Sequence, residues 1–181
     1  NGDILVTLTN SPPRDVGGIE GFIMKTLMGR AGAGEPSPDT LVLLRDSDGD
    51  GRADIRRVLR EDGLDSPSGM AYADGTLYVA NHNALLAFDY ELESPNLTGE
   101  PRKLMDLPGG GNHWMRNIIL SPDGEQIYVA VGSASNIGEY GLEQEVGRAA
   151  IREIDLRTGA ERLFASGLRN PVGMAFEPES D

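Results

Sequence analysis

Residues 109–136 have the sequence GGGNHWMRNIILSPDGEQIYVAVGSASN, and this stretch decides the fold. It contains two short apolar segments, NIILSP and QIYVAVG, that are typical of β-strands, with a Pro-Asp-Gly turn between them. A glycine-rich segment with a histidine and the single tryptophan precedes the first strand, and a Ser/Asn-rich loop follows the second. The order predicts a hairpin that presents polar side chains at one rim of a β-scaffold.

The hairpin recurs along the chain. Residues 66–81 (SPSGMAYADGTLYVAN) and 170–181 (NPVGMAFEPESD) align with it, and Gly69, Asn117 and Gly173 fall in register. Third and fourth strand-like segments follow the two complete hairpins, at residues 85–90 and 102–107 and at residues 148–156 and 161–166. Four antiparallel strands repeated every 45–55 residues or so are typical of β-propeller blades. The sequence therefore predicts an all-β propeller.

About three blades are present, because residues 1–9 match the second half of a further copy. We expect residues 1–181 to form a single partial propeller domain, the N-terminal half of a longer ring. Residues 10–40 are predicted to be a long loop and helix insertion, which is either a lid or a packed helix. An open half-ring exposes sheet edges, so the remaining blades, from the same protein or a dimer partner, are expected to cover them.

Blade topology predicts where a site lies. In an up-and-down sheet, the connections between blades and between second and third strands emerge on one face. That face collects the longest loops, at residues 10–40, 81–84, 108–116, 132–147 and 166–171. A site is therefore expected there, near the propeller axis.

Composition excludes several classes of partner. The net charge is −13, from 29 acidic and 16 basic residues, without a basic run, which argues against nucleic acid or an anionic membrane. No cysteine is present, so disulfides and thiolate metal sites are excluded. No apolar run approaches the roughly 20 residues of a membrane span.

His113 is the candidate catalytic residue. It follows three glycines and Asn112 at a predicted strand entry near the axis. A neutral imidazole can take a proton from a substrate hydroxyl. His82 is also on the predicted site face, but no accompanying residues mark it, and it is interpreted as a polar loop residue.

Four further residues are candidate cofactor ligands. Arg116 and Arg169 offer fixed positive charge for a carboxylate or quinone oxygen, or form a salt bridge or carbonyl clamp between blades. Asn170 follows Arg169 in GLRNP, and Asn136 lies in the loop at 132–147, where it either binds a ligand or caps a turn.

The segment DSDGDGRAD at 46–54 is the candidate metal site. Alternate carboxylates on a tight turn can converge on Ca²⁺, although Arg57 stands where a bidentate Glu completes such loops. The alternative is an acidic turn without metal. The candidate ligands are Asp46, Asp48, Asp50 and Asp54.

These motifs resemble the soluble quinoprotein sugar dehydrogenases, and most of all the sorbosone dehydrogenase-like branch. The segments NHWMRN, GLRNP, RDSDGDGRAD and SGMAYADGTLYVAN carry the resemblance, which covers nearly the whole chain. It implies a six-bladed propeller that binds pyrroloquinoline quinone (PQQ) and Ca²⁺, oxidises a sugar hydroxyl or aldehyde hydrate, and passes electrons to an artificial or haem acceptor. It also implies a periplasmic or secreted protein.

The resemblance assigns roles by position. His113 matches the general base, Arg169 the arginine that stabilises charge on the quinone oxygen, Asn170 its neighbour, and Arg116 a positioning arginine. The residues that hold the active-site Ca²⁺ belong to later blades in that family. Two other functions stay open: a non-catalytic propeller module, and a metal-dependent propeller lactonase, which would need carboxylates near the axis.

Overall fold

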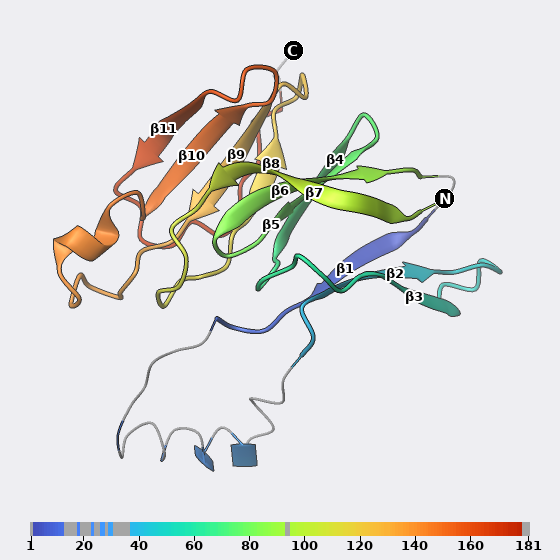
Figure 1. Cartoon of the computed structure of the whole chain (residues 1–181), viewed down its shortest axis with the longest axis horizontal. Coiled ribbons are helices and arrows are strands. Elements are labelled where there is room, and N and C mark those ends of the chain that lie inside the picture. Colours follow the sequence, from blue (N-terminus) through green and yellow to red (C-terminus); the bar gives the residue numbers. More distant parts are fainter. Residues whose placement is uncertain are drawn as a thin grey trace.

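The computed structural model describes residues 2–12, 18, 23, 26–27, 29–30, 37–92 and 95–178. Within them the chain forms three antiparallel sheets, each built from strands in sequence order (Figure 1). The first sheet contains β1 (Ile4–Leu8), β2 (Thr40–Arg45) and β3 (Ile55–Arg60). The second contains β4 (Gly69–Ala73), β5 (Thr76–Ala80), β6 (Ala84–Tyr90) and β7 (Leu97–Asp106). The third contains β8 (Ile118–Leu120), β9 (Gln126–Val131), β10 (Ala150–Asp155) and β11 (Glu161–Ser166).

The predicted blade repeat is confirmed. The second and third sheets are four-stranded meanders, and the first lacks the innermost strand, as the match of residues 1–9 to half a copy predicts. Tight turns fix the hairpin registers. Asp74 and Gly75 both have positive φ between β4 and β5, the conformation of a two-residue type I′ turn.

The second sheet is buried on both faces, because it lies between the other two. Leu77 and Val79 of β5 pack in the cluster shared with the first sheet, whereas Tyr78 and Ala80 pack in the cluster shared with the third. The two-residue period of a strand sends alternate side chains to opposite faces. This explains why the segment TLYVA is apolar at nearly every position.

Adjacent blades approach most closely where their innermost strands begin. A Cβ added to Gly69 would lie 2.5 Å from Arg116 O and 2.9 Å from Ile118 N. Beside it, Ser68 Oγ accepts a hydrogen bond from Arg116 N (2.8 Å) and donates one to Arg116 O (3.0 Å). Glycine is therefore needed at position 69 for β4 and β8 to pack backbone against backbone.

The third copy of the repeat does not form a strand within residues 170–178. Its first residues nevertheless run beside the third sheet, because Ser133 N donates to Arg169 O (2.8 Å) and Asn117 Nδ2 donates to Val172 O. The ring of Phe176 packs edge-on against Tyr128 at 5.6 Å between centroids. An innermost strand obtains its ladder from the second strand of its own blade, and no such strand follows among the described residues.

The long insertion predicted at residues 10–40 falls mostly outside the described residues, and so does its predicted packing. The described residues between 18 and 30 have helical backbone. The base of the insertion is closed by Asn10, whose N–H donates to Asp39 Oδ1 (2.7 Å) and whose Oδ1 accepts from Ser37 N (2.8 Å).

Candidate functional site

The loops that carry the predicted catalytic and cofactor-binding residues gather on one face of the molecule. In Figure 1 the β7–β8 connection and the β9–β10 connection, which contains a 3₁₀ helix (η1, Leu142–Glu145), lie at the lower end of the third sheet. The short β8–β9 and β10–β11 turns lie at the opposite edge. Hydrogen bonds join the long loops on the first face, since Asn112 N donates to Ala134 O (2.7 Å) and Ser133 N donates to Arg169 O (2.8 Å). At the third sheet, the long and the short connections thus lie at opposite ends, in the arrangement that the strand order predicts.

His113 has one ring nitrogen held and one available. Its Nδ1 lies 3.0 Å from Ser133 O and 3.0 Å from Ser133 Oγ, while that hydroxyl donates to Ser135 O (2.7 Å). A carbonyl oxygen only accepts, so this pattern assigns the proton of the neutral ring to Nδ1. No described residue is hydrogen-bonded to Nε2, which therefore offers its lone pair as a base.

Asn170 lies beside His113 over Gly132. A Cβ added to Gly132 would lie 2.4 Å from His113 Cβ and 2.6 Å from Asn170 Oδ1. Because Gly132 has no side chain, His113 and Asn170 can both approach the end of β9. No sequence motif marks Gly132 as a site residue, because its role depends on contacts between two loops.

Arg169 and Asn136 form a pair at the surface of the same face. Arg169 Nε donates to Asn136 O (3.0 Å), and a terminal nitrogen donates to Asn136 Oδ1 (2.7 Å). Both residues are exposed, and Nη1 of Arg169 has no hydrogen bond to any described residue. The structure therefore brings together four of the five predicted catalytic and cofactor-binding residues.

Arg116 is the exception, because its side chain is 0% exposed. Its guanidinium donates to His113 O (2.8 Å), Met115 O (3.1 Å) and Pro108 O, and no described carboxylate pairs with it. Burial, followed by the charge of Arg148, lowers its pKa to about 10, so it remains charged at neutral pH. Of the two alternatives for Arg116, a ligand contact or a carbonyl clamp, this burial favours the clamp, which holds both ends of the loop carrying His113.

Two residues that the sequence did not single out organise the neighbouring loops. Glu145 in η1 accepts hydrogen bonds from Ala134 N (2.8 Å), Ser135 N (3.1 Å) and Ser135 Oγ (2.8 Å). Burial would raise the pKa of Glu145, but these bonds lower it on balance. Arg148 donates to Gly109 O and, at 3.3 Å, to Gly110 O. No local motif marks either residue, because each acts across a loop.

A second carboxylate fixes the part of this loop next to Arg169. Glu139 accepts from Ile137 N (2.7 Å) and Asn136 N (3.1 Å). The amides of Ile137, Glu139 and Asn136 lower the pKa of Glu139 to about 2. The carboxylate therefore stays ionised, and the backbone of Asn136 is held in one orientation.

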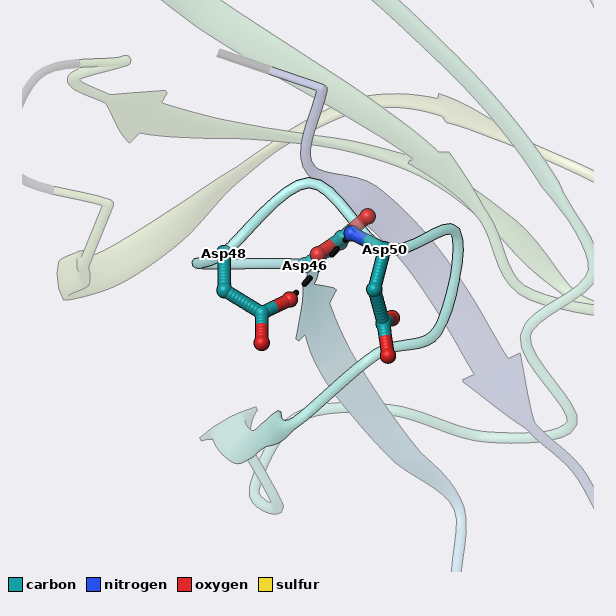
Figure 2. A group of neighbouring side chains, drawn as sticks. All are labelled: Asp46, Asp48 and Asp50. Atoms are coloured by element: carbon teal, nitrogen blue, oxygen red, sulfur yellow. Dashed lines mark hydrogen bonds between the residues drawn. The ribbon is translucent and has the colours of Figure 1, made fainter.

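The acidic turn between β2 and β3 lies outside this site. Asp46, Asp48 and Asp50 each place one carboxylate oxygen within 4.8 Å of the others. Figure 2 shows these three side chains on the turn. The turn is stabilised from within, since Asp46 accepts from Gly49 N (2.7 Å) and Gly51 N (2.8 Å). The amide of Gly51 is the main cause of the lowered pKa of Asp46.

Asp54 does not join the cluster. Its carboxylate accepts from Ser47 N (2.8 Å) and Ser47 Oγ, which lower its pKa. Arg57 is directed to Pro95 O rather than to the turn. The predicted set of four metal ligands is thus reduced to three carboxylates.

Among the described residues, no helix has the length and apolar character that a membrane span requires.

Trp114, next to His113, is half-buried. It is the only tryptophan in the chain and therefore an intrinsic fluorescence probe of this loop.

The solved structures that share the fold include the following three. The holo PQQ domain of pyranose dehydrogenase from Coprinopsis cinerea has a TM-score of 0.65 and 21% identity, covering 77% of this chain and 37% of that one. The calcium structure of a family AA12 carbohydrate-active enzyme from Trichoderma reesei has a TM-score of 0.63 and 23% identity, covering 76% and 38%. The iodide structure of the Trichoderma reesei enzyme has a TM-score of 0.62 and 20% identity, covering 96% and 45%.

These similarities confirm the propeller fold, and the chain spans less than half the length of each of these structures. No curated protein sequence matches the chain. The family model that matches is described as TrAA12-like, over residues 41–181, and the comparisons do not support the narrower sorbosone dehydrogenase-like branch. Since this match covers most of the chain, the protein belongs to the TrAA12-like family.

Proposed function

We propose that the protein is a quinoprotein oxidoreductase that oxidises a sugar hydroxyl or aldehyde hydrate with PQQ as the hydride acceptor. Family membership and the shared fold with the PQQ domain of pyranose dehydrogenase support this function. The observation that carries it is the state of His113, whose Nδ1 is held by Ser133 O while Nε2 is available. A base of this kind is what abstraction of a hydroxyl proton requires.

The residues on this face fit PQQ, which is a quinone with three carboxylates. Arg169 supplies a cation with an unused N–H group, and Asn136 and Asn170 supply exposed amide groups. When bound, PQQ supplies the two-electron acceptor that no side chain can provide. The buried Arg116 is excluded from the proposed ligand set.

In the proposed reaction, residues of this chain accept the substrate proton, orient the base and supply positive charge. Nε2 of His113 accepts the proton of the substrate hydroxyl, and Ser133 O keeps the Nδ1–H bond, which stabilises the imidazolium. Arg116 fixes the backbone of His113, so the ring is oriented before substrate binds. Arg169 places positive charge on the same face.

The finer assignments form part of the same proposal. We propose an aldose-type substrate of the sorbosone or glucose kind, a haem protein or artificial dye as electron acceptor, and a secreted or periplasmic location. We also propose that further blades, from the same protein or from a second copy, complete the PQQ site. The described carboxylates that cluster lie on the turn between β2 and β3, away from His113, which disfavours the lactonase alternative.

Titration with PQQ tests the proposed function. We expect saturable binding, measured by the quinone's absorbance, and dye reduction with at least one of a panel of sugars. The titration is run on the 181-residue chain and on a chain extended to full propeller length. No binding by a folded, extended protein would contradict the proposal and favour a non-catalytic propeller module.

Arg169→Met provides the residue-level test of the same site. Loss of its charged hydrogen bonds is expected to weaken PQQ binding about 10- to 100-fold. Arg162→Met is a matched control, because Arg162 is also exposed and also makes a double hydrogen bond, with Glu153 on the outer strands. Equal affinities for the two variants would exclude Arg169 as a ligand.

For the acidic turn we propose weak Ca²⁺ binding that stabilises the fold without affecting catalysis. Three carboxylates without a bidentate Glu suggest a Kd of about 1 mM. About 10 mM Ca²⁺ is then expected to add about 1.4 kcal/mol to the free energy of unfolding, or about 4 °C in Tm.

Differential scanning calorimetry with and without Ca²⁺ measures this shift. The double substitution Asp48→Asn with Asp50→Asn is expected to abolish it. Asp123→Asn, in the turn between β8 and β9, is expected to retain it. If Ca²⁺ raises the Tm of the wild-type protein and of both variants equally, the ion binds elsewhere.

A further inference from the structure

His82 lies in the β5–β6 connection with both ring nitrogens engaged. Nδ1 is 3.0 Å from Gly110 N, and Nε2 is 3.1 Å from Asp65 Oδ2. The His82 side chain is 13% exposed. The chain's other histidine, His113, has a nitrogen without any partner among the described residues, so the two rings are in opposite situations.

The partners of His82 define its protonation. The amide of Gly110 is a donor, so Nδ1 must accept, and the ring proton belongs to Nε2, which donates to Asp65. Asp65 is itself fixed to the β5–β6 connection. Its backbone O accepts from His82 N (3.1 Å), and its Oδ2 accepts from Asn83 Nδ2 (2.9 Å).

The glycine-rich loop before His113 packs directly on this ring. A Cβ added to Gly109 would lie 3.0 Å from His82 Cε1. Gly110 and Gly111 then turn the chain with φ of 68° and 82°, a region that favours glycine. Without a hydrogen-bonded partner, two consecutive glycines would leave this segment with high conformational freedom.

Side chains hold the loop from both of its sides. His82 accepts the N–H of Gly110, and Arg148 donates to the carbonyls of Gly109 and Gly110. The ends of the loop are held separately, by Arg116 at Pro108 O and His113 O. Of these contacts, only the one from His82 fixes an N–H group within the glycine run.

We propose that His82, oriented by Asp65, is a positioning residue that holds the Gly109–Gly111 turn and thereby sets the orientation of His113. The inference rests on the proposed function for its effect on turnover, and on geometry alone for its effect on the loop. His82 touches neither substrate nor cofactor in this role. It acts on His113 through Gly110, Gly111 and Asn112.

The test compares three variants. His82→Leu removes the acceptor for Gly110 N, whereas His82→Asn keeps an oxygen near the position of Nδ1. Asn83→Ala is the matched control, because it removes a neighbouring hydrogen bond to the same Asp65 carboxylate and leaves the Gly110 contact intact.

Two readouts do not depend on activity. In His82→Leu we expect amide exchange of Gly110 to become about tenfold faster, and acrylamide quenching of Trp114 to change in step. His82→Asn is expected to restore most of the protection, and Asn83→Ala to change it less than about twofold.

In the PQQ-loaded protein, His82→Leu is expected to lower kcat about tenfold or more with little change in KM, because the loop sets orientation and not affinity. Normal Gly110 protection in a folded His82→Leu protein would overturn the proposal. So would a loss of protection in Asn83→Ala equal to that in His82→Leu. If the wild-type protein has no turnover, the proposed function fails, while exchange and fluorescence still decide the role of His82.

Discussion

Alanine in place of Gly69 is expected to lower the free energy of unfolding by about 3 kcal/mol. The added Cβ would meet backbone atoms, Arg116 O at 2.5 Å and Ile118 N at 2.9 Å, which cannot rotate away as a side chain can. The second and third sheets must therefore separate or tilt. Urea denaturation, followed by far-UV circular dichroism and by Trp114 fluorescence, measures the loss.

Gly173→Ala is the control, since Gly173 holds the same position in the repeat as Gly69. A Cβ at Gly173 meets nothing within 4 Å, and neither glycine has a positive φ. We expect its stability to change by less than about 0.5 kcal/mol. If both substitutions lower the free energy of unfolding equally, the effect comes from alanine at this repeat position. It would then not come from the close contact between the second and third sheets.

His113→Gln is expected to lower kcat for sugar oxidation by a factor of about 10² to 10⁴ while the protein remains folded. Glutamine fills a similar space but cannot accept a proton at neutral pH. Dye-linked turnover measures the effect, and the emission of Trp114 reports whether the loop is retained.

Ser133→Ala is the matched control for this substitution. It removes the hydroxyl 3.0 Å from Nδ1 but keeps the carbonyl oxygen that accepts the Nδ1 proton. We expect a loss of less than about tenfold. Turnover by His113→Gln that is close to wild type would remove His113 from the role of base.

The blade pattern was predictable from sequence because the inner strands of each blade are short, largely apolar and bounded by turn residues. Segment 84–90 is an example, since it differs from the predicted 85–90 only by one residue at its start. The face that carries the site followed from the order of strands alone. His113, Arg169 and Asn170 were identified because they lie on that face in the motifs NHWMRN and GLRNP, and Asn136 because it lies in the Ser/Asn-rich loop on the same face.

The roles of Arg116 and His82 could not be predicted from the sequence, because both depend on tertiary contacts. An arginine three residues after His113 has the same sequence signature whether it faces a ligand or a ring of carbonyl oxygens. Its direction is set by Pro108 O, eight residues earlier, and by burial between sheets. The role of His82 depends on Asp65 and Gly110, which belong to two other connections and become neighbours only after the sheets have packed.

The strand order of each sheet also predicts the order of events during folding. Within the described residues, every ladder joins strands that are consecutive along the chain, so each sheet can assemble from its own segment. Contacts such as that of Gly69 with Arg116 join different sheets and require two finished surfaces. Because chain entropy penalises distant contacts, we expect sheets to form early and their docking to follow. We therefore expect the contact of Ser68 with Arg116 beside the candidate site to form only at this docking step, after the individual sheets have become ordered.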